Sequence, residues 1–312
     1  MRISWLLVLL AFLPSCRSGK ESSKLLLAEA LEISETEMPA VVELLDQQGR
    51  TQCTGTFVGP NAILTAAHCL QPRFGSAVRT PLVYLNQNDD FETIVQISSQ
   101  GQESGFGDDL AILILETDVA PASIKMNASG IASGTIMSLI GYGCTGGSVG
   151  AGHKRKGKAK ILDIKDDNRR SKSVIISTVT PRYPNQTQLP IQDRQAHLCP
   201  GDSGGPALID GAVAGVASWL DPSDSRGYVN RWASVSSEFA KSIFATSVAE
   251  GAKIENVHPN ADPSQVRIER FKTGREERKA ARAGAMQAKR RLRTDNQAGI
   301  EDRNRRQIES GL

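Results

Sequence analysis

A serine, a histidine and an aspartate stand in three short segments whose composition suits nucleophilic catalysis. Ser203 lies within the sequence Cys-Pro-Gly-Asp-Ser-Gly-Gly-Pro, His68 ends the sequence Leu-Thr-Ala-Ala-His, and Asp109 directly precedes an apolar run. Hydrolysis of a peptide requires an activated nucleophile, a base that takes its proton, a group that orients the base, and donors for the oxyanion. The three segments predict a site of this kind.

Each of these segments also has an ordinary structural explanation. The histidine could fill a core, the glycine-rich sequence could form only a turn, and the aspartate could cap a strand. Their joint occurrence favours catalysis, because three segments in the right order are more specific than one short motif. A metal site is not expected, since the four histidines lie far apart and no Cys-x-x-Cys or His-x-x-x-His spacing occurs.

The elements that must position these residues are predicted to be strands. With 39% hydrophobic and 23% charged residues, the composition is that of a globular protein, and 312 residues leave room for one all-β unit with extensions. Short apolar or alternating runs bounded by Gly, Pro, Asn and Asp predict strands over residues 40–45, 56–58, 62–64, 81–85, 93–97, 110–115, 136–142, 158–164, 173–179, 206–209, 213–219 and 228–235. Many short strands in succession indicate an all-β barrel or sandwich.

One helix is expected to close the strand region. Phe239, Ile243 and Phe244 recur at helical spacing within residues 237–248. Ser236 or Ser237 could cap its start, and a glycine at position 251 could end it.

The three motifs together resemble the signature segments of the chymotrypsin/trypsin family of serine proteases, in that family's order of His, Asp and Ser. The resemblance covers about residues 39–249 and is dense at the motifs. It implies an all-β fold of two six-stranded β-barrels with a C-terminal helix, a protein or peptide substrate, and no cofactor.

The resemblance also assigns a role to each residue of the motifs, with a triad that is the standard worked example of this chemistry. Ser203 is the implied nucleophile, His68 the general base and then acid, and Asp109 the carboxylate that orients His68. Asp108 competes for the last role, and Asp109 is preferred because it directly precedes the apolar strand. The backbone N–H groups of Gly201 and Ser203 are the implied oxyanion hole.

A specificity pocket is implied six residues before the nucleophile, where this chain has His197 with Leu198 beside it. An aspartate there would select Arg or Lys, and none is present. A histidine with an ordinary pKa near 6.5 can be a cation or a neutral donor. We therefore expect a preference for a small or acidic residue before the scissile bond.

The walls of this pocket follow from the same resemblance. Ser218 and Trp219 match the strand that pairs with the substrate backbone, and Gly227 fits the opposite wall. Leu220 stands where glycine is usual in the family. Its side chain is expected to narrow the pocket.

Two disulfides are implied near the motifs. Cys53 and Cys69 match the family's disulfide that braces the histidine segment. Cys144 and Cys199 lie in loops that are neighbours in the family, and we expect them to bond because the usual partner position of each is absent here.

The N-terminal residues 1–16 are typical of an export signal. A basic residue precedes an apolar run of 11 residues at 3–13, which is shorter than the roughly 20 that a membrane-spanning helix needs. The sequence Leu-Pro-Ser-Cys that ends at Cys16 resembles the lipobox of bacterial lipoproteins, whose cysteine is lipidated. A lipidated Cys16 leaves four of the five cysteines for two disulfides. The alternative is an ordinary cleaved signal, and both readings predict an exported chain, anchored at a bacterial cell envelope or secreted.

Activation is expected to differ from the family pattern. Family zymogens mature when a new Ile-Val-Gly-Gly N-terminus pairs with the acid before the serine, here Asp202. No such tetrapeptide precedes Cys53. Asp202 therefore needs another cation, or a second cleavage that releases an internal N-terminus.

The remaining segments are predicted from composition. Residues 17–38 look like a tether or pro-segment, residues 39–250 form the protease domain, and residues 251–312 form a basic tail with 15 Lys and Arg against 9 Asp and Glu. The tail is expected to be a solvated helix or disordered. Contact with an anionic surface is the functional alternative. Specific nucleic-acid binding is not expected, because Phe271 is the only aromatic residue that the tail offers for stacking.

Two classes of function remain open at this stage. The first is a serine endopeptidase that uses the triad. The second is a catalytically inactive binding or scaffold protein on a protease-like fold, for which Leu220 and the missing activation sequence would mark lost catalysis. The intact triad favours the enzyme.

Overall fold

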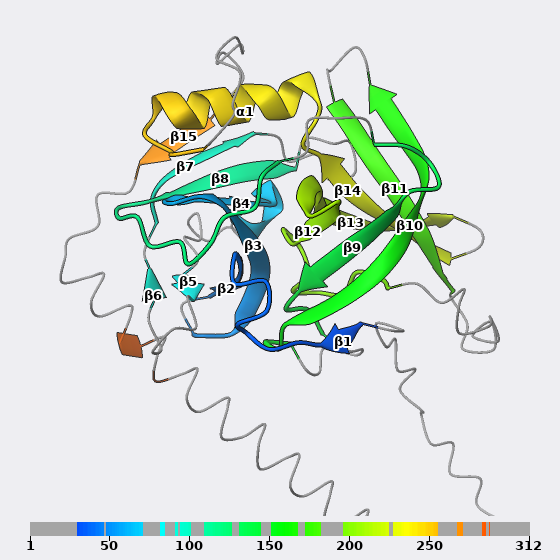
Figure 1. Ribbon diagram of the computed structural model, residues 1–312, viewed down its shortest axis with the longest axis horizontal. Coiled ribbons are helices and arrows are strands. Elements are labelled where there is room, and N and C mark those ends of the chain that lie inside the picture. The colour runs from blue at the N-terminus through cyan, green and yellow to red at the C-terminus, as the bar shows by residue number, and fades with distance from the viewer. Residues whose placement is uncertain are drawn as a thin grey trace, which may run out of the picture.

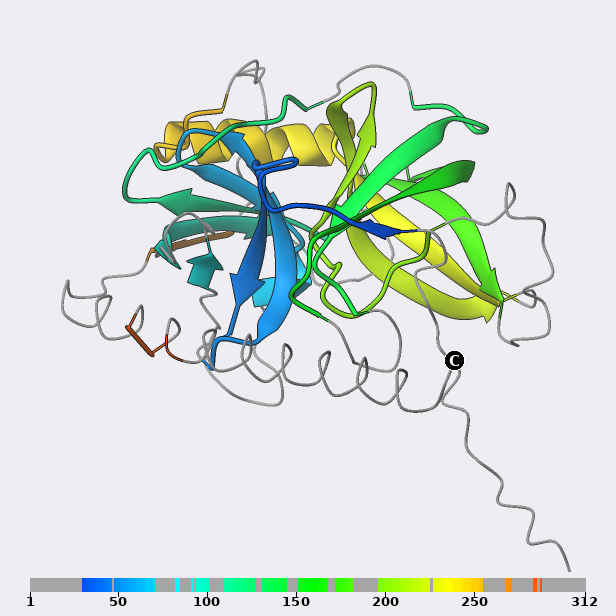
Figure 2. The same cartoon turned by 60° about the horizontal axis from the view of Figure 1, so that its bottom comes forward.

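The computed structural model describes residues 30–46, 48–70, 82–84, 91–92, 94–100, 109–126, 131–144, 151–167, 172–181, 196–224, 227–254 and 267–270, with positions 283, 284 and 287. Its strands build two antiparallel β-sheet bodies that lie side by side, and the helix α1 (Glu238–Ala249) runs along the first of them (Figures 1 and 2). The predicted signal at 1–16, the lipidation site Cys16, the alternative acid Asp108 and most of the tail lie outside the described residues.

The first sheet carries the segments that bear His68 and Asp109. Its strand order is β15 (Arg267–Arg270), β7 (Ile94–Gln100), β8 (Leu110–Leu115), β4 (Ala62–Thr65), β3 (Thr51–Gly59), β2 (Val41–Leu45), β5 (Leu82–Tyr84) and β6 (Phe91–Glu92). Every residue of β2, β4 and β8 is buried, so these continuous apolar runs behave as strands covered on both faces. The 3₁₀ helix η1 (Ala67–Leu70) follows β4 closely.

The second sheet closes on itself. Its order is β1 (Leu31–Glu32), β10 (Arg155–Asp167), β11 (Lys172–Pro181), β14 (Gly227–Ser234), β13 (Ala212–Asp224), β12 (Pro206–Ile209) and β9 (Ile136–Gly141), and β9 pairs again with β10. Six strands thereby form a barrel, and closure leaves fewer free strand edges than an open sheet. The seventh strand, β1, adds to β10.

The prediction of two all-β barrels with a C-terminal helix is confirmed. The second sheet is a closed six-stranded barrel extended by β1, and the first sheet holds eight strands, of which β4, β5, β6 and β15 have four residues or fewer. Strands β1, β6 and β15 come from residues for which no strand was predicted, since β1 lies in the range assigned to a tether, β6 directly before the strand predicted at 93–97, and β15 in the basic tail. The period-two signal is too short to recognise in strands of two and four residues.

The closing helix begins and ends as its sequence predicts. The Ser237 side chain accepts a hydrogen bond from the Ala240 N–H at 3.1 Å, which makes Ser237 the cap. Beyond the helix, Gly251 adopts a φ of 102°, a value that favours glycine. Phe239 and Ile243 on the inner face are buried. Within the described ranges, no helix combines the length and the apolar character needed to cross a bilayer.

The main hydrophobic core extends across the boundary between the two sheets. It joins Phe57 and Ile112 of the first sheet to Ile140 and Val216 of the second, all of them buried. A second cluster around Trp232 fills the other barrel. Because the larger core is shared, the two barrels are held in a fixed relation at the place where the motif segments meet.

Replacement of a shared-core side chain is expected to destabilise the whole domain. Ile63 of β4 is fully buried, so Ile63→Ala should lower the free energy of unfolding by about 2–5 kcal/mol through lost burial and the cavity left behind. Urea unfolding followed by tryptophan fluorescence measures the change. Ile136→Ala on β9 is the matched control, because Ile136 is 55% exposed and its loss should cost about 0.5 kcal/mol or less.

Candidate active site

His68 and Asp109 are held together by neighbouring strands. Thr65 at the end of β4 pairs with Ala111 of β8, which brings η1 next to the residue that precedes β8. His68 Nδ1 lies 2.6 Å from Asp109 Oδ2, and the His68 backbone N–H donates to Asp109 Oδ1 at 2.8 Å. With Nδ1–H directed at the carboxylate, the other ring nitrogen is left to accept a proton.

Ser218 gives the same carboxylate a third donor. Its hydroxyl donates to Asp109 Oδ2 at 2.7 Å, and Asp109 is only 2% exposed. The sequence placed Ser218 on the substrate-pairing strand and gave no signal of this bond. Three donors compensate the loss of water around the buried charge, which fixes the carboxylate behind the imidazole.

The segment that carries Ser203 packs directly against β3 and β4. The Ser203 carbonyl accepts from the Thr54 N–H at 2.8 Å, and the Gly204 N–H donates to the Ala217 carbonyl at 2.8 Å. Gly204 has a φ of 82°, and a Cβ there would overlap the Thr65 hydroxyl and the Thr54 carbonyl. The serine turn therefore lies against the end of β4, from which the chain leads to His68.

Two backbone N–H groups of this turn have no hydrogen-bond acceptor among the described residues. Around them, the Asp202 N–H donates to the Cys199 carbonyl and the Gly205 N–H to the Asp202 carbonyl, each at 2.9 Å. Within the described part of the chain, the N–H groups of Gly201 and Ser203 have no such partner. Donors left unpaired in this way can bind an oxyanion.

Thr54 is a functional residue that the sequence did not reveal. Besides its bond to Ser203, its hydroxyl donates to the Gly201 carbonyl at 2.8 Å and accepts from the Tyr142 N–H at 3.1 Å. Thr54 is fully buried, so it holds the serine turn and the end of β9 from one fixed position. A single threonine in a strand gives no signal of such a role in sequence.

The structure joins both of the cysteine pairs that were expected. Cys53 and Cys69 are bonded with a Cα–Cα distance of 6.2 Å, and Cys144 and Cys199 with 5.5 Å. The first disulfide bonds the residue after His68 to β3, and the second bonds the start of the serine turn to the loop after β9. Cys53, His68 and Cys69 are the group of possible ligands closest together among the described residues, but the disulfide leaves no thiolate for a metal there.

The predicted pocket residues lie on adjoining elements. His197 and Leu198 precede the serine turn, Ser218, Trp219 and Leu220 lie on β13, and Gly227 begins β14. The Leu198 N–H donates to Asn230 Oδ1 at 2.9 Å, which ties the pocket floor to β14. Asn230 is fully buried and was not singled out from sequence.

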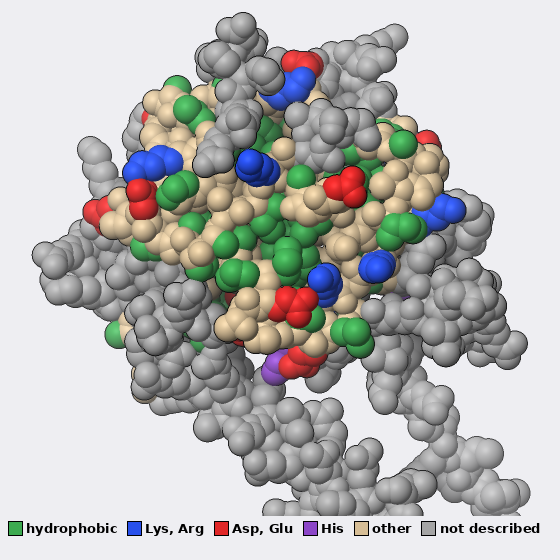
Figure 3. All heavy atoms as spheres, viewed as in Figure 1, with side chains coloured by type: hydrophobic (Ala, Val, Ile, Leu, Met, Phe, Trp, Pro, Cys, Tyr) green, Lys and Arg blue, Asp and Glu red, His purple; other side chains and the backbone are tan. Residues whose placement is uncertain are grey.

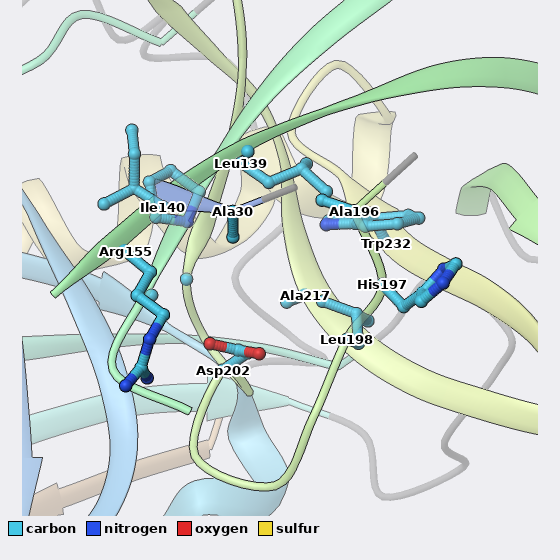
Figure 4. A pocket seen from close by; sticks show the side chains of 14 residues that line it. Ala30, Leu139, Ile140, Arg155, Ala196, His197, Leu198, Asp202, Ala217 and Trp232 are labelled. Atoms are coloured by element: carbon cyan, nitrogen blue, oxygen red, sulfur yellow. The ribbon is translucent and has the colours of Figure 1, made fainter. Parts of the chain in front are cut away.

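The His197 imidazole is neutral at neutral pH. Burial lowers the pKa of His197 to about 4, and its Nδ1 is buried without a hydrogen-bond partner in the described residues. Figure 4 shows the ring at the opposite side of a small cavity from Arg155 and Asp202. Of the two forms that the sequence allowed, the neutral donor is the one present at neutral pH.

This low pKa has a consequence for stability against pH. The unfolded chain takes up a proton on His197 below about pH 6.5, whereas the folded chain stays neutral until about pH 4, so folding stability is lost as pH falls through this window. Between about pH 7.5 and about pH 5, wild type should lose about 1–2 kcal/mol more than His197→Gln, measured by urea unfolding. Equal losses in the two proteins would contradict the neutral buried imidazole.

Two antiparallel β-barrels with an imidazole–carboxylate pair at their boundary define the chymotrypsin-like class of serine proteases. The family model described as Trypsin matches residues 30–243, and the chain belongs to that family. The match begins at residue 30, the first described residue. Residues 30–38 are therefore part of the matched domain.

Similar proteins and structures agree with this family. Trypsin of Saccharopolyspora erythraea is 29% identical over 190 residues, which are 58% of this chain and 81% of that protein. Human kallikrein-15 is 28% identical over 234 residues, 70% of this chain and 88% of that protein. A mutant of human heparin binding protein has a TM-score of 0.54 at 17% identity over 74% of this chain and 99% of its own. Neuropsin from mouse brain has a TM-score of 0.51 at 18% identity over 71% and 98%. At such low identity the last two likenesses show the fold alone.

Proposed function

We propose that the chain is a serine endopeptidase that hydrolyses peptide bonds through an acyl-enzyme on Ser203. The observation that supports this most directly is the 2.6 Å contact between His68 Nδ1 and the buried carboxylate of Asp109. An imidazole oriented in this way is a general base for a hydroxyl on its other side. The serine turn against β3 and β4 supplies that hydroxyl.

Catalysis then proceeds in two steps that use the same residues. His68 takes the Ser203 proton as the oxygen attacks the substrate carbonyl, and Asp109 stabilises the imidazolium. The N–H groups of Gly201 and Ser203 bind the oxyanion. His68 then gives the proton to the leaving amine. Water attacks the acyl-enzyme with His68 again as the base, which releases the acid product and regenerates the Ser203 hydroxyl.

The substrate pocket favours a small residue, or one with an oxygen that accepts a hydrogen bond from neutral His197. An acidic residue meets the second condition through its carboxylate, and Leu220 limits the size of any side chain that enters. Trp219, which is 43% exposed, is available to contact substrate. A peptide library cleaved mainly after Arg or Lys would contradict this specificity.

Export and anchoring follow from the sequence of residues 1–16. We place the enzyme outside the cytoplasm of a bacterium, held to its cell envelope by lipid on Cys16, with an ordinary cleaved signal and secretion as the alternative. Intact mass of the native protein distinguishes a lipidated chain from an unmodified one. Cys16→Ser should release the enzyme to the medium without change in turnover.

The basic tail is proposed as a solvated segment, with contact to an anionic surface as its alternative role. On the coloured part of the face in Figure 3, positive and negative side chains are interspersed and form no patch of one sign. Outside that face, the excess of basic residues in the sequence lies at 251–312, with 15 Lys and Arg against 9 Asp and Glu. Deletion of residues 271–312 with unchanged activity and localisation would exclude a partner for the tail.

A binding or scaffold protein is the alternative function. One structural neighbour is a mutant of human heparin binding protein, so this fold also occurs in a protein whose name states a binding function. The oriented imidazole and the free oxyanion donors favour an enzyme, because a pure binder has no need of them.

Covalent labelling of Ser203 separates the two functions. A fluorophosphonate probe should modify wild type at Ser203, and Ser203→Ala should not react, because only an activated serine attacks the phosphorus. Mass spectrometry of the labelled peptide identifies the residue. An unreactive wild type, both before and after limited proteolysis, would support the binding protein.

Asp109→Asn is expected to leave the fold intact and to lower kcat by about 10⁴-fold, because the amide favours the wrong imidazole tautomer. The measurement is turnover of a peptide substrate, with thermal unfolding to verify the fold. Asp118→Asn is the matched control, since Asp118 is exposed and pairs with Lys253 at the surface. An Asp109→Asn enzyme with wild-type kcat would exclude Asp109 as the residue that orients His68.

A further inference from the structure

The carboxylate of Asp202 occupies a site built for it next to the nucleophile. Its Oδ1 accepts the Gly143 N–H at 2.8 Å and its Oδ2 accepts the Cys199 N–H at 2.9 Å. A Cβ on either Gly141 or Gly143 would overlap the Asp202 side chain. The position of this carboxylate therefore governs the turn that holds Gly201 and Ser203.

Two neutral donors do not balance the charge of this group. Asp202 is 6% exposed, and burial raises the pKa of its carboxyl to about 7, against the lowering effects of the two amides and of Arg155. A buried carboxylate stays ionised when a cation lies near it. The ionised form of the Asp202 carboxyl therefore depends on a nearby cation.

Arg155 is the cation whose charge lowers the pKa of Asp202. It is 7% exposed at the start of β10, and its Nη1 donates to the Gly143 carbonyl at 2.7 Å. The same residue, Gly143, donates its N–H to Asp202. Arg155 and Asp202 line one cavity of about 20 Å³, which is room for about one water molecule, and their side chains lie on the same side of it (Figure 4).

Neighbouring elements hold Arg155 in this place. β10 is paired on one edge with Gly141 of β9 and on the other with Glu32 of β1. Attraction to Glu32 and to Asp202 opposes the effect of burial, which lowers the pKa of Arg155. The guanidinium remains charged, because its ordinary pKa is far above neutral pH.

The other nearby cations are directed elsewhere. Lys154 Nζ donates to the carbonyls of Glu35, Glu37 and Met38 at 2.9–3.3 Å, and Lys156 pairs with the Glu37 carboxylate at 3.2 Å. His153 lies 3.2 Å from a Glu32 oxygen.

The chain itself also reaches the cavity. Ala30 lines it together with Arg155 and Asp202 (Figure 4). In the uncut chain Ala30 is joined to Glu29 by a neutral peptide bond, so it brings no ammonium to Asp202.

We infer that Arg155 is the internal counter-charge of Asp202 and holds the Gly201–Ser203 turn in its reactive conformation without a new N-terminus. Arg155 is a positioning residue that acts through Asp202 and Gly143. This inference rests on the proposed peptidase function. It predicts that the chain is active with the peptide bond before Ala30 intact.

The test compares Arg155→Met and Arg155→Lys with wild type, each as the full chain whose uncut N-terminus is verified by mass. Arg155→Met removes the charge and keeps much of the side-chain volume, so we expect its rate of fluorophosphonate labelling and its kcat to fall about 100-fold or more, with a smaller change in KM. Arg155→Lys should recover part of the loss, because a cation is restored. Arg50→Met is the control, since Arg50 pairs with Asp46 at the surface.

The outcomes separate this inference from the proposed function. Uncut wild type that labels only after proteolysis creates a new N-terminus would overturn the role of Arg155 and leave the peptidase function in place. Equal labelling of wild type and Arg155→Met would also contradict the role of Arg155 and leave the peptidase function in place. If wild type never reacts with the probe, both the role of Arg155 and the peptidase function are contradicted. If Arg155→Met does not fold by circular dichroism, the reaction of uncut wild type and the partial activity of Arg155→Lys still decide the matter.

Discussion

A carboxylate buried between two barrels is the constraint on which the site depends. Asp109 accepts bonds from the His68 ring, the His68 backbone and the Ser218 hydroxyl. Two of these donors belong to the first sheet and one to the second, so the charge is satisfied only when both barrels are docked in one register. An uncompensated buried charge costs several kcal/mol, and this cost couples the assembly of the site to the assembly of the fold.

A second buried carboxylate lies on the other side of the nucleophile and is satisfied differently. Asp109 accepts hydrogen bonds from the side chain and backbone of His68, which follows β4, and from the Ser218 side chain on β13. Asp202 instead accepts hydrogen bonds from backbone N–H groups of its own turn and of the loop after β9. Thr54 connects the two regions, because its carbonyl accepts a bond from the Thr65 hydroxyl before His68, and its hydroxyl bonds to Gly201 and Tyr142 near Asp202. The nucleophile is thus held between two charges whose partners are fixed by strand packing.

The elements that depend on local sequence pattern were predicted correctly. Continuous apolar runs such as Leu110–Leu115 identified buried strands, and the Ser237 cap and Gly251 bounded the helix correctly. Local pattern did not identify Thr54, Asn230 or Arg155, because their roles arise from contacts between residues 32 to 147 positions apart, or from contacts across a paired strand, which no local period encodes. The two-residue strand β1 escaped for the same reason, since its pairing partner decides its conformation.

The packing of residues 30–38 sets a lower limit on the length of a stable domain. Lys154 is 2% exposed, and its ammonium is solvated by three carbonyl oxygens from Glu35, Glu37 and Met38. A recombinant polypeptide that started at residue 39 would lack those oxygens and leave the Lys154 ammonium beside the Tyr142 ring without these acceptors. Residues 30–38 thus take the place of water around the buried Lys154 ammonium.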